Sequence, residues 1–206
     1  MIAIVDYGVG NLFSLQSSLQ FLGIDVVVTN AEKVLRDCEK IILPGVGAFA
    51  DAMEKLKQSG LDKVIIEECG KGKPLLGICL GMQMLFERSL EYGDHQGLGL
   101  IQGSVEPISE MIANGLKVPH IGWNGLIFPK DKEKSKLYEY VKESDCVYYV
   151  HSFAAIHCDC YVTAQAEYGG YLTGSVEKGN VYGTQFHPEK SGEVGLGILK
   201  AFCELV

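Results

Sequence analysis

The chain has 206 residues, of which 47% are hydrophobic and 21% charged, a composition typical of a globular protein with a buried core. Its formal net charge of −8 argues against nucleic acid and against an anionic membrane surface as partners. The seven cysteines follow no disulfide-scaffold spacing, which favours reduced thiols in a cytoplasmic protein. We expect one domain over residues 1–206, without a signal peptide or a membrane span, because Asp6 interrupts the first apolar run and no later run could cross a bilayer.

The first part of the chain alternates between apolar strand-like runs and helix-like segments. We predict strands at 2–5, 25–29, 41–43 and 73–76. Helices are predicted at 12–22, from 48 to about 57, at 61–69 and at 82–88. Because strand–helix–strand units place their strands in parallel, this part predicts a parallel sheet covered by helices.

From residue 98 the pattern changes to short β-like runs without long helices between them. These runs lie at 98–107, 126–128, 146–153, 161–167, 171–177 and 180–186. The segment 177–180 predicts a hairpin turn, and a final helix is expected after Ser191. The expected fold is therefore α/β, with a mixed, mostly parallel central sheet flanked by helices and extra antiparallel strands in the C-terminal half.

Two glycine-rich loops follow predicted strands. The first, 8–10, invites a dinucleotide-binding interpretation, but Phe13 stands where a third glycine is needed, so we predict no nucleotide cofactor. The second, 44–47, has a glycine on each side of Val46 and follows the strand at 41–43. Ligands bind at the carboxyl ends of parallel strands, so this loop is either part of a site, with peptides that rotate at little strain, or a plain strand-to-helix turn.

The segment Gly77–Gly81 places Cys79 where a buried strand turns into a helix. It is the cysteine counterpart of the G-x-S-x-G nucleophile elbow, in which glycines leave room for a cramped backbone and an approaching substrate. The unpaired N–H groups and the positive end of the helix favour a thiolate, and the Leu80 amide is positioned to donate to an oxyanion. The alternative is a buried, unreactive cysteine in a glycine-rich turn.

A cysteine nucleophile needs a base and a group that orients the base. His187 is the preferred base, because Pro188 favours an extended chain in which Glu189 lies on the same side and accepts the imidazole N–H. His151 is the rival base and has no carboxylate two residues away. The segment 157–160 looks like a metal cluster but lacks a second pair of ligands, so we predict no metal site.

These segments together resemble a known family. Gly77–Gly81 with Gln83, and His187–Glu189 far downstream, are similar to the motifs of the class I (triad) glutamine amidotransferases. Further segments, 6–11, 43–47, 119–124 and 185–191, resemble the glutaminase subunits of imidazole glycerol phosphate synthase, and the resemblance runs from Met1 to the last helix. The sequence Pro-Gly-Val-Gly favours these glutaminase subunits over other members of the family, since relatives that make other products usually carry Pro-Gly-Gly or Ser-Gly-Gly.

The resemblance implies a triad of Cys79, His187 and Glu189 that hydrolyses glutamine to glutamate and ammonia through a γ-glutamyl thioester. It implies an oxyanion hole made by the N–H groups of Leu80 and Val46. The glutamine contacts that it implies are Gly47, Gln83 and the backbone at Ser152 and Phe153, where Phe153 replaces a common tyrosine. We also expect the Val46 carbonyl to face Cys79 in the resting chain and to turn away on activation.

The resemblance also implies a partner. In the family, ammonia passes to a cyclase subunit, a (βα)8 barrel, which uses it in histidine biosynthesis. We therefore expect a heterodimer, with Asn11, Trp123 and Lys190 as candidate docking residues. The alternatives are the glutaminase component of another amidotransferase, a stand-alone cysteine hydrolase of the γ-glutamyl hydrolase type, and a non-catalytic binding module with a vestigial site.

Overall fold

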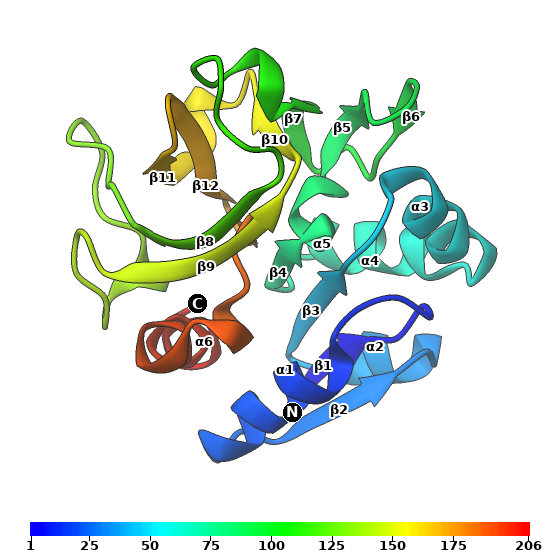
Figure 1. The fold of residues 1–206 in the computed structure, drawn as a ribbon. Coiled ribbons are helices and arrows are strands. Elements are labelled where there is room, and N and C mark those ends of the chain that lie inside the picture. Colours follow the sequence, from blue (N-terminus) through cyan, green and yellow to red (C-terminus); the bar gives the residue numbers. More distant parts are fainter.

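A seven-stranded sheet lies at the centre of the computed structural model, which describes all 206 residues (Figure 1). Its strand order is β11-β12-β13-β4-β3-β1-β2. The strands are β1 (Ile2–Val5), β2 (Val26–Thr29), β3 (Lys40–Gly45), β4 (Leu75–Cys79), β11 (Val162–Glu167), β12 (Tyr171–Lys178) and β13 (Val181–Thr184). Strands β1 to β4 and β13 pair in parallel, whereas β12 pairs antiparallel with β11 and β13. The predicted mixed, mostly parallel sheet is confirmed.

Helices cover both faces of this sheet because alternate side chains of the strands belong to two separate cores. The helices are α1 (Leu12–Phe21), α2 (Glu32–Asp37), α3 (Phe49–Gln58), α4 (Leu61–Gly70), α5 (Leu80–Gln83) and α6 (Gly192–Leu205). Ala3 and Val5 share a core with α2, α3 and α4, while Ile2 and Ile4 pack with α1 and α6. The ribbon shows α1 and α6 on one side of the sheet and α3 and α4 on the other (Figure 1).

Two smaller sheets stand beside the central one. A four-stranded sheet has the order β10-β7-β5-β6, and β8 pairs antiparallel with β9. Their strands are β5 (Phe86–Ser89), β6 (His95–Gln96), β7 (Ile101–Pro107), β8 (His120–Gly125), β9 (Cys146–His151) and β10 (Phe153–Ile156). Single 3-10 turns lie at η1 (Ile108–Glu110), η2 (Lys136–Tyr138), η3 (Asp159–Tyr161) and η4 (Pro188–Lys190).

Three details of the sequence-based prediction are wrong. The helix expected at 82–88 ends after one turn at Gln83, because Phe86 is buried and opens a strand that pairs with β7. Tertiary pairing here overrides local helix propensity. No regular strand forms at 126–128, where one was expected. The strand in this region is β8, which ends at Gly125, and beyond it an isolated bridge joins Ile127 to Gln165. Helix α2 was not predicted, since only Leu35 of its six residues is buried.

A buried carboxylate holds α2 and α4 together. Glu68 is 5% exposed, and its oxygens lie 2.8 Å from Lys71 Nζ, 2.9 Å from Lys73 Nζ and 3.2 Å from Arg36 Nη1. Hydrogen bonds from Lys71 and then Lys73 lower the pKa of Glu68 to about 2. The charged form of the Glu68 carboxylate is therefore more stable in the folded chain than in the unfolded chain.

We expect Glu68→Gln to lower the free energy of unfolding at neutral pH, because three cations lose their shared anion. Since the pKa of Glu68 is depressed on folding, its contribution is complete above the unfolded value of about 4.3 and is lost as the pH falls toward 2. Urea unfolding at several pH values measures this difference. Glu67→Gln is the matched control, because Glu67 pairs with the same Arg36 and Lys71 but is half exposed. Equal losses for both variants, or a loss that persists at pH 2, would contradict the prediction.

Candidate active site

A cavity of about 290 Å³ lies at the carboxyl ends of the parallel strands, where β4 ends at Cys79. Its walls come from the strand ends and from the segments that follow β5, precede β8 and end β9. The lining residues are Val46, Gly47, Cys79, Leu80, Gln83, Glu91, Tyr92, Pro119, Val150, His151, Ser152, Phe153 and His187. The structure thus brings together every predicted catalytic, oxyanion and glutamine-contact residue except Glu189, which lies behind His187.

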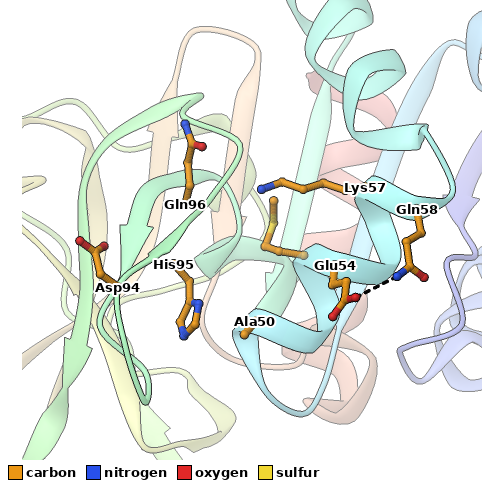
Figure 2. Close-up of a pocket in the computed structure, with 8 residues that line it drawn as sticks. Ala50, Glu54, Lys57, Gln58, Asp94, His95 and Gln96 are labelled. Carbon is orange, nitrogen blue, oxygen red and sulfur yellow. Dashed lines mark hydrogen bonds between the residues drawn. The ribbon is translucent and has the colours of Figure 1, made fainter.

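A larger depression, of about 690 Å³, lies elsewhere, between α3 and the turn that carries β6 (Figure 2). Glu54, Lys57 and Gln58 line it from the helix, and Asp94 and His95 line it from the opposite turn. These side chains are of mixed charge, and the depression contains no cysteine. We therefore place the chemistry at the smaller cavity, which holds a nucleophile and a base.

Cys79 has the strained backbone that a nucleophile elbow requires. Its φ is 54° and its ψ is −111°, in a region that residues other than glycine rarely adopt. The flanking glycines serve packing rather than substrate access: a Cβ at Gly81 would collide with the Leu43 carbonyl oxygen, and one at Gly77 would lie 2.7 Å from the Gly81 carbonyl oxygen. Helix α5 has only four residues, so it offers unpaired N–H groups but little macrodipole.

The two glycines beside Val46 have different roles. A Cβ at Gly45 would lie 2.8 Å from the Gly81 nitrogen and 2.9 Å from the Tyr7 hydroxyl oxygen, so Gly45 is required for close packing at the end of β3. Gly47 has a φ of 93° and open space around it. Gly45 therefore has a packing role as well, while the rotation of the peptides on either side of Val46 stays a prediction.

His187 is held between the nucleophile and a buried carboxylate. Its Nδ1–H donates to Glu189 Oε1 at 2.9 Å, and the two side chains are 2% and 3% exposed. Burial disfavours its charge, but hydrogen bonds to Cys79 and Glu189 prevail and raise the pKa of His187 to about 9. At neutral pH the imidazolium is therefore available as an acid beside the sulfur. The second Glu189 oxygen has no partner.

His151 lines the cavity, but neither ring nitrogen is free. Its Nδ1 lies 2.8 Å from the Phe153 carbonyl oxygen, and its Nε2 lies 3.1 Å from His120 Nδ1. Burial lowers the pKa of His151 to about 4. The geometry therefore favours His187 over His151 as the base.

Sequence reasoning missed two side chains at this site. Glu91 lines the cavity, and its Oε2 accepts the Phe49 N–H at the start of α3. No short motif points to it, because its loop has no regular spacing to Cys79. Gln185 is fully buried and its Nε2 lies 3.8 Å from Cys79 Sγ. The two-residue spacing that indicated Glu189 on one side of His187 also indicates Gln185 on the other.

The candidate docking residues lie on elements that adjoin one another. Asn11 precedes α1, Lys190 ends η4 and is exposed, and α1 contacts η4. Trp123 on β8 is 58% exposed and lies edge-on to Tyr148 of β9, which also contacts η4. No group of three or more His, Cys, Asp or Glu side chains is arranged to hold a metal ion. No helix has the length and apolar character needed to cross a membrane.

Changing Glu189 to glutamine tests the base assignment. We expect Glu189→Gln to lower kcat for glutamine hydrolysis by about tenfold to a hundredfold, because an oxygen acceptor remains but the charge that stabilises the His187 imidazolium is lost. His187→Ala should lower kcat by about 10⁴-fold. A pH–rate profile measures the accompanying fall in the pKa of His187. Glu193→Gln, at an exposed carboxylate nearby, is the control. A His151→Ala variant more damaged than His187→Ala would refute the assignment.

Comparison with known proteins agrees with this geometry. The family model described as glutamine amidotransferase class-I matches residues 3–204. Subunit HisH of imidazole glycerol phosphate synthase from Oceanobacillus iheyensis is 48% identical over 207 residues, covering 100% of this chain and 100% of its own. The HisH subunit of Aquifex aeolicus is 46% identical and covers 97% of this chain and 94% of its own.

Solved structures share the fold at lower identity. A crystal structure of a glutamine amidotransferase matches with a TM-score of 0.74 at 20% identity, over 98% of this chain and 100% of its own. PurLQS from Thermotoga maritima matches with a TM-score of 0.70 at 22% identity, over 98% and 96% of the two chains. The full-length match to HisH subunits is far closer in sequence, and the chain therefore belongs to the class I glutamine amidotransferases and, within them, to the HisH subunits of imidazole glycerol phosphate synthase.

Proposed function

We propose that this chain hydrolyses glutamine to glutamate and ammonia through a thioester on Cys79, and passes the ammonia to a cyclase partner. One observation carries the proposal: Cys79 and His187 line the same cavity at the end of the parallel strands, and the Nδ1–H of His187 donates to the buried Glu189. This is the order of nucleophile, base and orienting group that covalent hydrolysis requires.

The proposed steps follow from the protonation state of His187. The Cys79 sulfur attacks the carboxamide carbon, and the oxyanion that forms accepts hydrogen bonds from the N–H groups of Leu80 and Val46. The His187 imidazolium protonates the leaving nitrogen, so that the C–N bond breaks, ammonia departs and a γ-glutamyl thioester remains. Neutral His187 then takes a proton from water as the water attacks the thioester. The C–S bond breaks, and glutamate leaves.

The substrate contacts come from both walls of the cavity. We assign Gly47 and the backbone at Ser152 and Phe153 to glutamine, as the family resemblance implies, and all three residues line the cavity. Gln83 Nε2 is already committed to the Phe153 carbonyl oxygen and to Gln185, so its Oε1 is the atom that remains for the substrate. We add Glu91, whose carboxylate at the cavity wall suits the α-ammonium group of an amino acid.

The partner is inferred from the relatives. Those relatives are named as subunits of imidazole glycerol phosphate synthase, and we propose for this chain a heterodimer with the cyclase subunit, a (βα)8 barrel. Asn11, Trp123 and Lys190 are proposed to contact the partner. We propose that the chain acts in the cytoplasm, in histidine biosynthesis, as one domain over residues 1–206.

We expect the chain alone to release glutamate about a hundredfold more slowly than the complex with the cyclase and its nucleotide ligand. The reason is that the Val46 N–H would point away from Cys79 at rest and toward it only when activated, and a missing oxyanion donor costs about 3 kcal/mol. Mainly kcat should change, because this donor acts in the transition state. Assays of glutamate release with and without the partner and ligand measure the ratio. A full rate without the partner would instead favour a stand-alone hydrolase.

A further inference from the structure

The side chain of Gln185 occupies a buried position between the nucleophile and Gln83. It is 0% exposed and does not line the cavity. Its Nε2 lies 3.8 Å from Cys79 Sγ, and its Oε1 lies 3.0 Å from Gln83 Nε2. An amide that is fully enclosed and directed at the reacting sulfur has a role beyond filling space, because a buried polar group needs partners.

The neighbouring bonds determine which end of the Gln185 amide faces the sulfur. Gln83 Nε2 donates one hydrogen to the Phe153 carbonyl oxygen at 3.1 Å and the other to Gln185 Oε1. Because Gln185 must present its oxygen to Gln83, its NH₂ group is left for Cys79. The reversed amide would place two donors against each other.

A pair of histidines contacts the same Phe153 carbonyl oxygen from the other side. The Phe153 carbonyl oxygen also accepts His151 Nδ1–H at 2.8 Å, so His151 Nε2 is an acceptor and takes the His120 Nδ1–H at 3.1 Å. The His120 ring is stacked between Tyr149 and Tyr168, with ring centroids 4.9 Å and 4.2 Å away. A series of hydrogen bonds therefore runs from His120 on β8 through His151, the Phe153 carbonyl and the two glutamines to the thiol of Cys79.

We propose that Gln185 is a catalytic residue that donates an N–H to the Cys79 sulfur, and that His120 and His151 are positioning residues that hold the Gln83–Gln185 pair in the required orientation. The proposal rests on the proposed glutaminase function. The Gln185 N–H stabilises the thiolate when it attacks, and again when it leaves the thioester during hydrolysis.

Two substitutions at Gln185 test the role. Gln185→Glu keeps the volume and an acceptor for Gln83 but replaces the donor with an oxygen, whereas Gln185→Leu removes both polar groups. For both variants we expect kcat for glutamine hydrolysis by the complex to fall about tenfold to a hundredfold, as for the loss of a hydrogen bond to a charged group. KM should stay within about twofold in Gln185→Glu, because this variant keeps the acceptor for Gln83 and residue 185 does not reach the cavity.

A second readout needs neither glutamine nor the partner. Alkylation of the full chain by iodoacetamide, followed peptide by peptide, reports the pH at which Cys79 becomes reactive. We expect this midpoint to move to higher pH in Gln185→Leu and further in Gln185→Glu, because a carboxylate beside the sulfur opposes a thiolate. The exposed Cys160 in the same molecule is the internal reference and should not move.

Gln58 supplies the matched control, since it is an exposed amide on α3 that bonds only to Glu54. Gln58→Glu and Gln58→Leu should leave kcat, KM and the alkylation profile unchanged.

His120→Phe keeps the stacking but removes the donor to His151, and it should move the Cys79 midpoint in the same direction by a smaller amount. Combined with Gln185→Glu, it should add little, because both changes act through one chain of bonds.

The two proposals fail in different ways. A wild-type complex that hydrolyses no glutamine refutes the proposed function. An unchanged kcat and an unchanged alkylation midpoint in Gln185→Glu refute the role of Gln185, as does a rise confined to KM. If Gln185→Leu does not fold, the results for Gln185→Glu decide the test, because this variant keeps the volume of the side chain.

Discussion

Glutamine hydrolysis is expected to disappear in Cys79→Ala, with kcat falling by about 10⁴-fold or more, because no other group at the site can form the thioester. The complex of this variant with its cyclase partner should still make product from added ammonia. The reason is that only the release of ammonia needs the thiol, while the cyclase chemistry lies in the other subunit.

The two activities are measured in parallel, with glutamine or with an ammonium salt as the nitrogen source. Cys160→Ala is the control for the loss of a thiol, because Cys160 is exposed and does not line the cavity of the triad. Its glutamine-dependent rate should match that of the wild type. Loss of both activities in Cys79→Ala, in a variant that still binds the partner, would count against a two-site enzyme.

Gly81→Ala should cause a large loss of stability. The new Cβ would collide with the Leu43 carbonyl oxygen and would lie 2.8 Å from the Leu43 carbonyl carbon. Both partners are backbone atoms in the centre of the sheet, so neither can move away cheaply. We expect the free energy of unfolding to fall by about 3 kcal/mol or more, as measured by urea denaturation.

The matched control for this prediction is Gly70→Ala. Gly70 ends α4, and a Cβ there meets nothing within 4 Å. Alanine is favoured over glycine in helices by about 1 kcal/mol, so this variant should be as stable as the wild type or more stable. A Gly81→Ala protein that unfolds within about 1 kcal/mol of Gly70→Ala would show that α5 shifts easily, contrary to our view of its packing.

Features that depend on nearby residues could be predicted from the sequence. The Gly77–Gly81 pattern and the spacing of His187 and Glu189 each concern a few consecutive residues, and the structure brings Cys79 and His187 to one cavity. The parallel order of the first strands follows from the alternation of strands with helices.

Features set by distant contacts could not be predicted. The segment after Gln83 has helix-forming residues, but the pairing of Phe86 with Ile101 ends the helix. Glu91 reaches the cavity through a loop whose path depends on its bond to Phe49, and no local pattern encodes that bond. The hydrogen bond between His120 and His151 joins two strands that lie far apart in the sequence.

The place of β4 in the sheet has a consequence for how the site can move. With β3 on one side and β13 on the other, β4 is the middle strand, and its residues are all buried. The amides of such a strand exchange with solvent hydrogen only when the whole sheet opens. We therefore expect the nucleophile to lie on the part of the molecule that opens least often. Any conformational change between turnovers is then expected in the peripheral segments around it. The strained backbone of Cys79 persists because the paired strand β3 and the helix α5 that follows it hold the residue in place.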